Sequence, residues 1–160
     1  MTDVHVKIRP ATTADAQDIL ECLAAAFMPY RDSYTPGAYR DTVLSAETIR
    51  ARLDAMNVLV VEHPTDGVVG TIAFAVADGS EGHLRGMAVL PSQQGKGVAA
   101  QLLHAAEQRL RKLGCATATL DTTEPLTRAI RFYIDHGYAP TGVVRDFFGM
   151  PLAEYAKSLG

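Results

Sequence analysis

The 160-residue chain has no tryptophan, only two cysteines, and few aromatic residues, which make up 7% of the sequence. Cys22 and Cys115 lie far apart without a CxxC spacing, so we expect two buried thiols and neither a disulfide nor a metal pair. No run of residues approaches the roughly 18 apolar positions of a membrane span. The segment that starts at Met1 lacks the charged and apolar regions of a secretory signal. We therefore expect a cytoplasmic protein with no metal and no membrane partner.

The sequence also lacks an excess of positive charge. Its 15 Lys and Arg residues are outnumbered by 18 Asp and Glu residues. A nucleic-acid-binding module normally carries a dense basic face, so we expect no nucleic-acid partner. Residues 1–80 hold 6 basic and 11 acidic side chains, whereas residues 81–160 hold 9 and 7. This asymmetry favours a cationic ligand on the first half and an anionic ligand on the second, although sampling noise in a small protein explains it equally well.

Length and composition indicate one globular domain over residues 1–160, because 48% of the residues are hydrophobic and 21% are charged. Alternating or continuous apolar runs predict strands over residues 4–9, 58–61, 68–77, 82–90, 116–120, 138–144 and 152–158. Helical spacing predicts helices over residues 16–27, 46–56, 95–113 and 126–136. Residues 30–40 are predicted to be an irregular loop. This order predicts an α+β fold in which helices cover both faces of a mixed sheet.

The longest predicted helix follows a strand, a proline and a loop that contains two glycines. A helix N-terminus offers unpaired N–H groups and the positive end of the helix dipole, which together suit a phosphate. Gly95 and Gly97 let the backbone approach such a ligand closely. The P-loop pattern fails because Lys96 is followed by glycine and because position 90 is leucine. A dinucleotide fingerprint is disfavoured because this loop does not follow the first strand of a βαβ unit.

Two segments resemble the signatures of the GNAT acetyltransferases. Gln94-Gly-Lys-Gly97-Val-Ala99 is similar to motif A of that family, Gln/Arg-x-x-Gly-x-Gly/Ala, and Ala88-Val-Leu-Pro91 is similar to the strand and proline before it. Ala129-Ile-Arg-Phe-Tyr133-Ile-Asp-His-Gly137-Tyr138 resembles the second signature, a tyrosine on a helix that ends in glycine and an aromatic residue. The resemblance covers nearly the whole chain. It implies a GNAT fold, with a mostly antiparallel sheet and a V-shaped splay between two parallel strands.

The same resemblance implies that acetyl-coenzyme A is the co-substrate and indicates where it binds. Backbone N–H groups of the loop and helix start would hold its pyrophosphate, at Gln94, Gly95, Lys96, Gly97, Val98, Ala99 and Ala100. The pantetheine arm would pair with the strand at Met87, Ala88 and Val89. Close helix–sheet packing is the alternative reason for such small residues. The side chains of Lys96, Arg128 and Arg131 are candidates for the phosphates, or are simply solvated.

The resemblance also implies catalytic roles. Tyr133 matches a tyrosine that protonates the leaving thiolate in many relatives, and its alternative role is a core side chain. His83 stands near the place of the general base, with a pKa suited to neutral pH. Glu81 would face the same side of the strand and could act through a water. Either residue could instead be a solvated strand end. A strand N–H near Val89 would stabilise the oxyanion.

The last part of the implied site is the acceptor pocket. Tyr30, Arg31 and Tyr34 lie where relatives form part of that pocket, although these side chains could equally pack the loop down. The implied reaction is direct attack of a primary amine, on a small molecule or a peptide, in a ternary complex. The alternatives are a non-catalytic acyl-coenzyme A sensor or interaction module, and the same fold with another acyl donor. A monomer and a homodimer are both compatible with the sequence.

Overall fold

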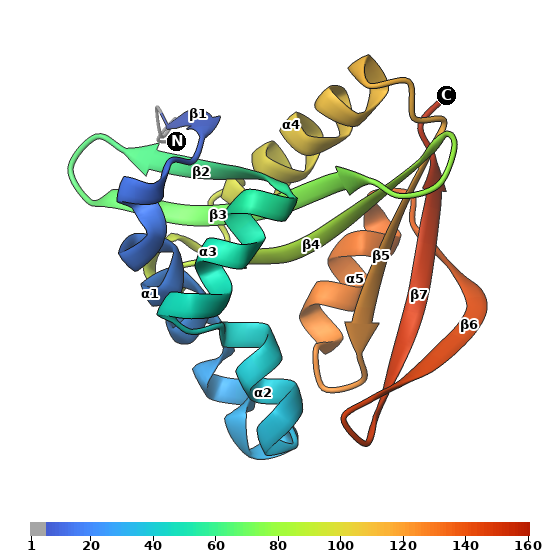
Figure 1. Cartoon of the computed structure of the whole chain (residues 1–160), viewed down its shortest axis with the longest axis horizontal. Coiled ribbons are helices and arrows are strands. Elements are labelled where there is room, and N and C mark those ends of the chain that lie inside the picture. The colour runs from blue at the N-terminus through green and yellow to red at the C-terminus, as the bar shows by residue number, and fades with distance from the viewer. Residues whose placement is uncertain (1–5) are drawn as a thin grey trace.

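The computed structural model describes residues 6–160 as one seven-stranded sheet with the strand order β1-β2-β3-β4-β5-β7-β6 (Figure 1). Within these residues β4 and β5 are the only parallel neighbours, and all the other pairs are antiparallel. The strands are β1 (Lys7–Pro10), β2 (Asn57–His63), β3 (Gly67–Val76), β4 (Glu81–Val89), β5 (Thr117–Thr123), β6 (Ala139–Phe147) and β7 (Met150–Ser158). The predicted mixed sheet is therefore confirmed. Of the predicted first strand, residues 4 and 5 lie outside the described residues.

Five α-helices accompany the sheet: α1 (Ala16–Phe27), α2 (Pro36–Val43), α3 (Ala46–Ala55), α4 (Val98–Lys112) and α5 (Thr127–Asp135). No helix in the described part of the chain is both long and apolar enough to cross a membrane. The predicted irregular loop over 30–40 is wrong, because it contains a 3₁₀ turn (Met28–Ser33) and the start of α2. Thr35 caps α2 by accepting a hydrogen bond from the Ala38 N–H at 3.3 Å, and Pro36 occupies the first turn.

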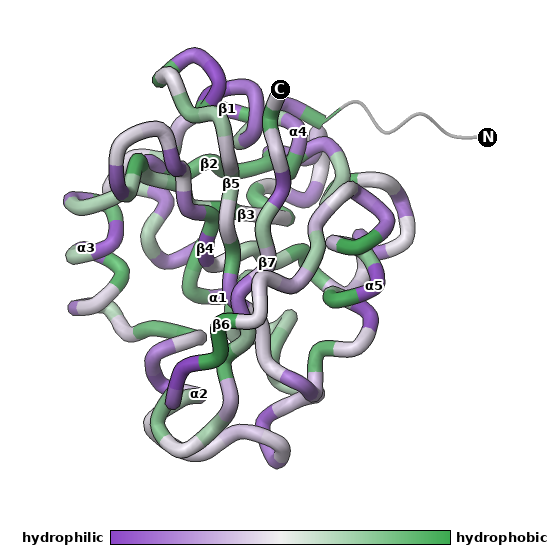
Figure 2. Tube along the Cα trace, turned by 90° about the vertical axis from the view of Figure 1, so that its right-hand side faces the viewer, coloured by the Kyte–Doolittle hydropathy of each residue, from purple (hydrophilic) through white to green (hydrophobic). Residues whose placement is uncertain are grey.

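The two faces of the sheet carry separate cores. Val58 and Val60 of β2 pack with Ile19 of α1 and Ile49 of α3. The alternate residues of β2 pack with α4, as the period of two along a strand requires; this second core includes Leu59, Val61, Leu102, Leu103, Ala106 and Leu110. Helices therefore cover both faces, as predicted (Figure 1). Hydrophobic and hydrophilic segments alternate along α3 and α5, as expected for helices with one face on a core (Figure 2).

A β-bulge changes which residues of β4 face each helix layer. Ala73 of β3 lies opposite Arg85, but Thr71, two residues earlier, lies opposite Ala88, so β4 holds one extra residue in this interval. Before the bulge, the even-numbered Leu84 faces the α4 core. After the bulge, the even-numbered Ala88 faces α1 and α3 instead. Gly86 lies in the bulge with a φ of 63°, a backbone conformation that favours glycine.

The bulge coincides with an opening between the two parallel strands. The pairing of β4 with β5 ends at Leu84 opposite Leu120, although β4 continues to Val89 and β5 to Thr123. Figure 1 shows the two strands starting together and diverging. The predicted V-shaped splay is thus confirmed. It leaves backbone N–H and C=O groups of both strands without a partner strand, and such groups need a partner.

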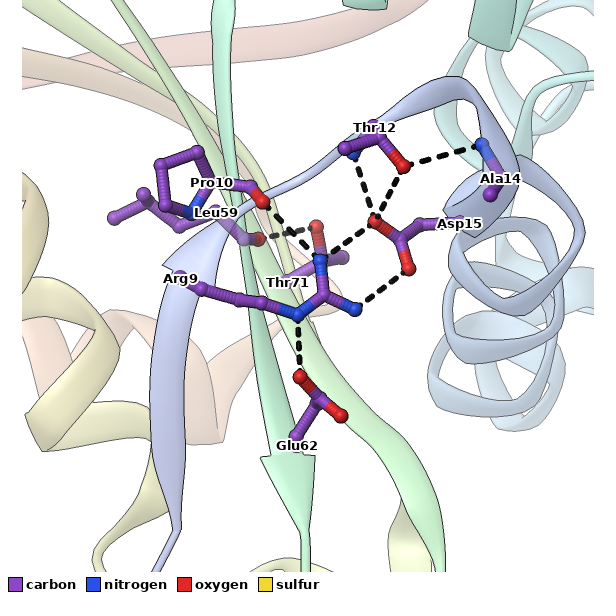
Figure 3. Close-up of polar contacts among 8 residues, drawn as sticks. All are labelled: Arg9, Pro10, Thr12, Ala14, Asp15, Leu59, Glu62 and Thr71. Carbon is purple, nitrogen blue, oxygen red and sulfur yellow. Dashed lines mark hydrogen bonds and ion pairs between the residues drawn. The ribbon is translucent and has the colours of Figure 1, made fainter.

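Two polar clusters fix elements around this frame. Arg9 of β1 makes two hydrogen bonds of 2.8 Å to the carboxylate of Asp15, which also accepts from the Thr12 N–H, and it contacts Glu62 of β2 (Figure 3). Thr12 and Asp15 form a capping box, and it begins a 3₁₀ turn that leads into α1. The cluster therefore ties the start of α1 to the edge of the sheet.

The second cluster joins α4 to the C-terminal strands. Glu107 of α4 is only 1% exposed. Its carboxylate accepts a hydrogen bond from the Tyr138 hydroxyl at 2.7 Å and two from the Lys157 ammonium at 3.1 Å. Burial and this carboxylate raise the pKa of Tyr138. A buried charge with these partners holds the segment after α5 against α4.

Candidate active site

A pocket of about 900 Å³ occupies the opening between β4 and β5. Its walls come from the loop before α4, the bulged half of β4, the end of β5, the inner side of α5 and the segment from α1 to α3. Residues far apart in the sequence therefore share one cavity. One end of the cavity lies at the glycine loop and the other lies among aromatic residues of the first half of the chain.

The glycine loop, where the pyrophosphate is predicted to bind, lines the pocket, but the helix starts later than predicted. Gly95 and Gly97 adopt φ angles of 78° and 83°, and Gly97 caps α4, which begins at Val98 and not at residue 95. A Cβ on either glycine would meet no atom within 4 Å, so both residues are needed for their backbone conformation and the space beside them is open. The predicted start of this helix is wrong because left-handed glycines cannot belong to it.

Some of the residues around these glycines line the pocket, and others do not. Gln94, Ala99 and Ala100 line the pocket, and the Gln94 side chain donates a hydrogen bond to the Val89 carbonyl at 3.0 Å. The side chain of Lys96 is exposed and that of Val98 is in the α4 core, and neither lines the pocket. Val98 could therefore offer a ligand only its backbone N–H group, whereas the exposed Lys96 side chain stays a predicted partner of the phosphates. Of the two predicted arginines, Arg128 lines the pocket and Arg131 does not.

The middle of the pocket has polar groups without partners. Met87, Ala88 and Val89, which are predicted to pair with the pantetheine arm, line it. Two buried side-chain atoms in the described residues have no hydrogen-bond partner, Gln93 Oε1 and Thr122 Oγ1, and both residues line the pocket. Buried polar atoms are rarely left unpaired in folded proteins, so a ligand with amide groups fits this channel. The sequence did not indicate Thr122, because the predicted strand ended at residue 120.

Tyr133 of α5 lines the pocket and is surrounded by rings. Its ring packs edge-on against Phe132 at 5.5 Å and against Tyr138 at 6.0 Å between centroids. No side-chain hydrogen bond of its hydroxyl is found within residues 6–160. Burial raises the pKa of Tyr133, so the hydroxyl keeps its proton at neutral pH. A protonated, unpaired hydroxyl in the cavity can donate a hydrogen bond to a bound molecule.

His83 lies on β4 where the splay begins. Its Nδ1 is 2.8 Å from Thr119 Oγ1, and the Thr119 hydroxyl can donate to the Gly82 carbonyl at 3.4 Å. This arrangement favours a proton on Nδ1 and a lone pair on Nε2, which lies 3.6 Å from the Asp121 carboxylate. Burial lowers the pKa of His83, while the charge of Asp121 opposes that shift. His83 is therefore a neutral base that is held in one orientation.

Two other predicted residues are not in the pocket. Glu81 lies at the closed end of the splay, where β4 still pairs with Thr117 of β5, and it does not line the cavity. Arg31 is exposed on the 3₁₀ turn and does not line the pocket, where an open loop was predicted. Tyr30 and Tyr34 do line the pocket. The Tyr34 hydroxyl is 2.6 Å from Thr123 Oγ1, which joins the first half of the chain to β5.

A model of the acetyltransferase (GNAT) family matches residues 18–138. The chain belongs to this family. This membership confirms the GNAT fold and the dependence on acetyl-coenzyme A that the resemblance implied. The splay, the bulge and the glycine loop all lie within the matched residues. Comparison with curated proteins gives no match for the chain.

Solved structures of GNAT proteins share the fold over the whole chain. A GCN5-related N-acetyltransferase from Rhodopseudomonas palustris has a TM-score of 0.80 and 21% identity, over 99% of this chain and 98% of that one. PaiA N-acetyltransferase from Thermoplasma acidophilum, in complex with coenzyme A, has a TM-score of 0.78 and 18% identity, over 99% of both chains. YncA from Salmonella typhimurium, with its cofactor acetyl-CoA, has a TM-score of 0.73 and 23% identity, over 98% and 95%.

Proposed function

We propose that this GNAT protein transfers the acetyl group of acetyl-coenzyme A to a primary amine, which attacks directly in a ternary complex. The observation that carries the proposal is the single pocket that joins the glycine loop to His83 and Tyr133 through the splay. Both substrates can meet there without a covalent enzyme intermediate, since Cys22 and Cys115 are buried in the packing and line no part of it. When bound, acetyl-coenzyme A supplies the acetyl group as an activated thioester.

The chain's own groups suit the coenzyme. The first-turn N–H groups of α4, at Val98, Ala99 and Ala100, have no acceptor within the helix and face an anion with the positive end of the dipole. The unpaired edge of β4 at Met87–Val89 and the orphaned Thr122 hydroxyl can pair with the amides of an extended arm. These groups orient the donor so that its reactive end lies beside the bulge.

His83 prepares the amine. A protonated amine cannot attack, so a base must first accept its proton, and Nε2 of His83 can do so. Thr119 holds the ring orientation through Nδ1, and the Asp121 carboxylate stabilises the imidazolium that forms. Glu81 remains a second candidate base, acting through a water from the end of the strand.

Tyr133 serves the leaving sulfur. Its hydroxyl donates a hydrogen bond to the developing thiolate and then supplies the proton. The burial that raises the pKa of Tyr133 also raises the proton affinity of a thiolate beside it, so burial alone does not oppose the transfer. Leu126 also lines the pocket, so it gives the coenzyme an apolar contact there.

Two measurements test the proposed function. Titration calorimetry with acetyl-coenzyme A tests the donor, and release of free coenzyme A thiol with a panel of small and peptide amines tests the transfer. Binding without any transfer would favour the non-catalytic sensor, and faster transfer from a longer acyl-coenzyme A would favour another donor. Absence of binding would refute the proposal.

The setting of the enzyme is also a proposal. We infer that it works in the cytoplasm as a monomer or homodimer, without a nucleic-acid or membrane partner and without a metal. The unpaired thiols of Cys22 and Cys115 suit a reducing compartment. The net charge of −3 gives no support to nucleic-acid binding.

A further inference from the structure

The acceptor end of the pocket holds a guanidinium group without a carboxylate partner. Arg52 projects from α3 into the pocket, and a Cβ on Gly86 in the β4 bulge would collide with its Nη1. Among the ion pairs of residues 6–160, none involves Arg52. No side-chain hydrogen bond of Arg52 is found in this part of the chain either, and the residue is half-buried where it lines the cavity.

The neighbouring Arg85 differs from Arg52, because it has a carboxylate partner and is more exposed to solvent. Arg85 is paired with Asp41 at 2.9 Å, and its side chain is 46% exposed. Asp41 is thereby engaged, and Arg52 faces a second positive charge and a loss of water. Burial lowers the pKa of Arg52 to about 10, with Arg85 acting in the same direction and the charge of Asp41 opposing it, and the group stays charged at neutral pH. An anionic ligand at this place would relieve the cost of a partly buried, unpaired cation.

The position of Arg52 relative to His83 limits the size of that ligand. His83 lies on the side of β4 that faces α1 and α3, because odd-numbered residues before the bulge point away from the α4 core, and Arg52 reaches the same strand from α3 at Gly86. Gly86 is the third residue after His83, which places it roughly 10 Å away along β4. A small molecule can therefore present an amine to His83 while its anionic group contacts Arg52.

We propose that the amine acceptor also carries a carboxylate, as a free amino acid does, and that Arg52 binds this carboxylate; the inference rests on the transferase function proposed above. A guanidinium presents a planar fork that matches a carboxylate with two parallel hydrogen bonds. One unpaired cation balances one negative charge, which favours a carboxylate over a doubly charged phosphate. Phe27, Tyr30 and Tyr34 line the same end, so the rest of the acceptor is apolar or aromatic.

Matched acceptor pairs test the inference with the intact enzyme. The probes are L-phenylalanine against L-phenylalaninamide and L-leucine against L-leucinamide, with kcat/KM measured by thiol release. We expect each acid to exceed its amide by about tenfold or more, the size of a charge-assisted hydrogen-bonded contact. The amide amine loses its proton more easily, so this comparison is biased against the inference.

Variants of α3 supply the controls. Arg52→Gln should lower the acid-to-amide ratio by about tenfold or more. Arg50→Gln is the matched control, because Arg50 is exposed on the same helix and does not line the pocket, and it should keep the wild-type ratio. If Arg52→Gln does not fold, Arg52→Lys should still lower the ratio, because it keeps the charge without the fork. In the wild type, N-acetyl-L-phenylalanine should inhibit more strongly than its amide.

The outcomes separate this inference from the proposed function. Acetylation of amides or simple amines, with the acids equal or poorer, would overturn the carboxylate site and leave the transferase intact. An Arg52→Gln variant that lowers both rates alike, with no change in their ratio, would also overturn it. A failure to bind acetyl-coenzyme A in calorimetry would refute the transferase itself.

Discussion

The pH dependence of the reaction gives the most direct test of His83. If Nε2 of His83 accepts the proton of the amine, kcat/KM rises with pH through the pKa of this imidazole. An ordinary histidine titrates near ~6.5. Burial lowers the pKa of His83, so the rise should be centred below that value. The rise shifts to lower pH because burial disfavours the charged imidazolium, and the neutral base therefore persists to lower pH.

The neighbours of His83 determine how variants move this rise. Asp121 of β5 and, more weakly, Glu154 of β7 and Glu81 of β4 raise the pKa, whereas Arg85 lowers it. Asp121→Asn removes the nearest negative charge, so the rise should move to lower pH and kcat should fall. Removal of the base in His83→Gln should lower kcat/KM by about 10²–10⁴-fold, which is the usual value of general base help.

The assay must separate His83 from the amine's own ionisation. We would measure kcat/KM from pH 5 to pH 8.5 with saturating acetyl-coenzyme A and two acceptors whose amines have different pKa values. A rise that belongs to His83 stays at the same pH for both acceptors, whereas a rise from the amine moves with it. If His83→Gln keeps the wild-type profile and Glu81→Gln flattens it, Glu81 is the base. If neither variant changes the profile, the enzyme selects an amine that is already deprotonated.

Three further predictions concern the coenzyme, the acid and the frame. Gly97→Val forces a β-branched residue to a φ of 83° at the start of α4, so acetyl-coenzyme A binding should be lost in calorimetry while circular dichroism stays native; unchanged affinity would remove the loop from the site. Tyr133→Phe should lower kcat by about 10-fold or more with coenzyme affinity kept, and an unchanged kcat would return Tyr133 to a packing role. Glu107→Gln should lower the free energy of unfolding, measured in urea, by about 3 kcal/mol, because the Lys157 charge loses its partner. The exposed control Glu124→Gln should lower it by no more than ~0.5 kcal/mol. An equally small loss for Glu107→Gln would show that the Glu107–Lys157 pair does not stabilise the fold.

Much of the fold could be predicted because its signals are local. The apolar spacing of α4, the Ser45 cap of α3 and the Asp66-Gly67 turn before β3 each depend on residues close in the chain. The helix α2 was missed because it is only eight residues long and begins with Pro36-Gly37, a pair that is typical of turns. The decisive signal was the hydroxyl of Thr35, which caps the helix directly before the proline.

The site could be predicted only where a motif marks it. The glycine loop and Tyr133 belong to segments that resemble known signatures, and both line the pocket. Asp121 and Thr122 were missed because a polar run after an apolar strand is typical of a loop. They extend β5 because its other edge pairs with β7, where Asp121 lies opposite Glu154. That pairing joins residues more than thirty positions apart and leaves no trace in local composition.

The sum of charges along a segment of the sequence also failed to predict the charge at the pocket. The excess of acidic side chains in residues 1–80 favoured a cationic acceptor there, yet Arg52 belongs to this half and reaches the pocket, and several of the acidic residues are engaged elsewhere. Asp15 and Glu62 pair with Arg9, and Asp41 pairs with Arg85. A ligand responds to the charges within about a Debye length of it and not to the sum over a segment. The acceptor end therefore has two signs, Asp121 beside His83 and Arg52 beside Gly86, and a molecule with both an ammonium and a carboxylate group complements it better than a simple cation.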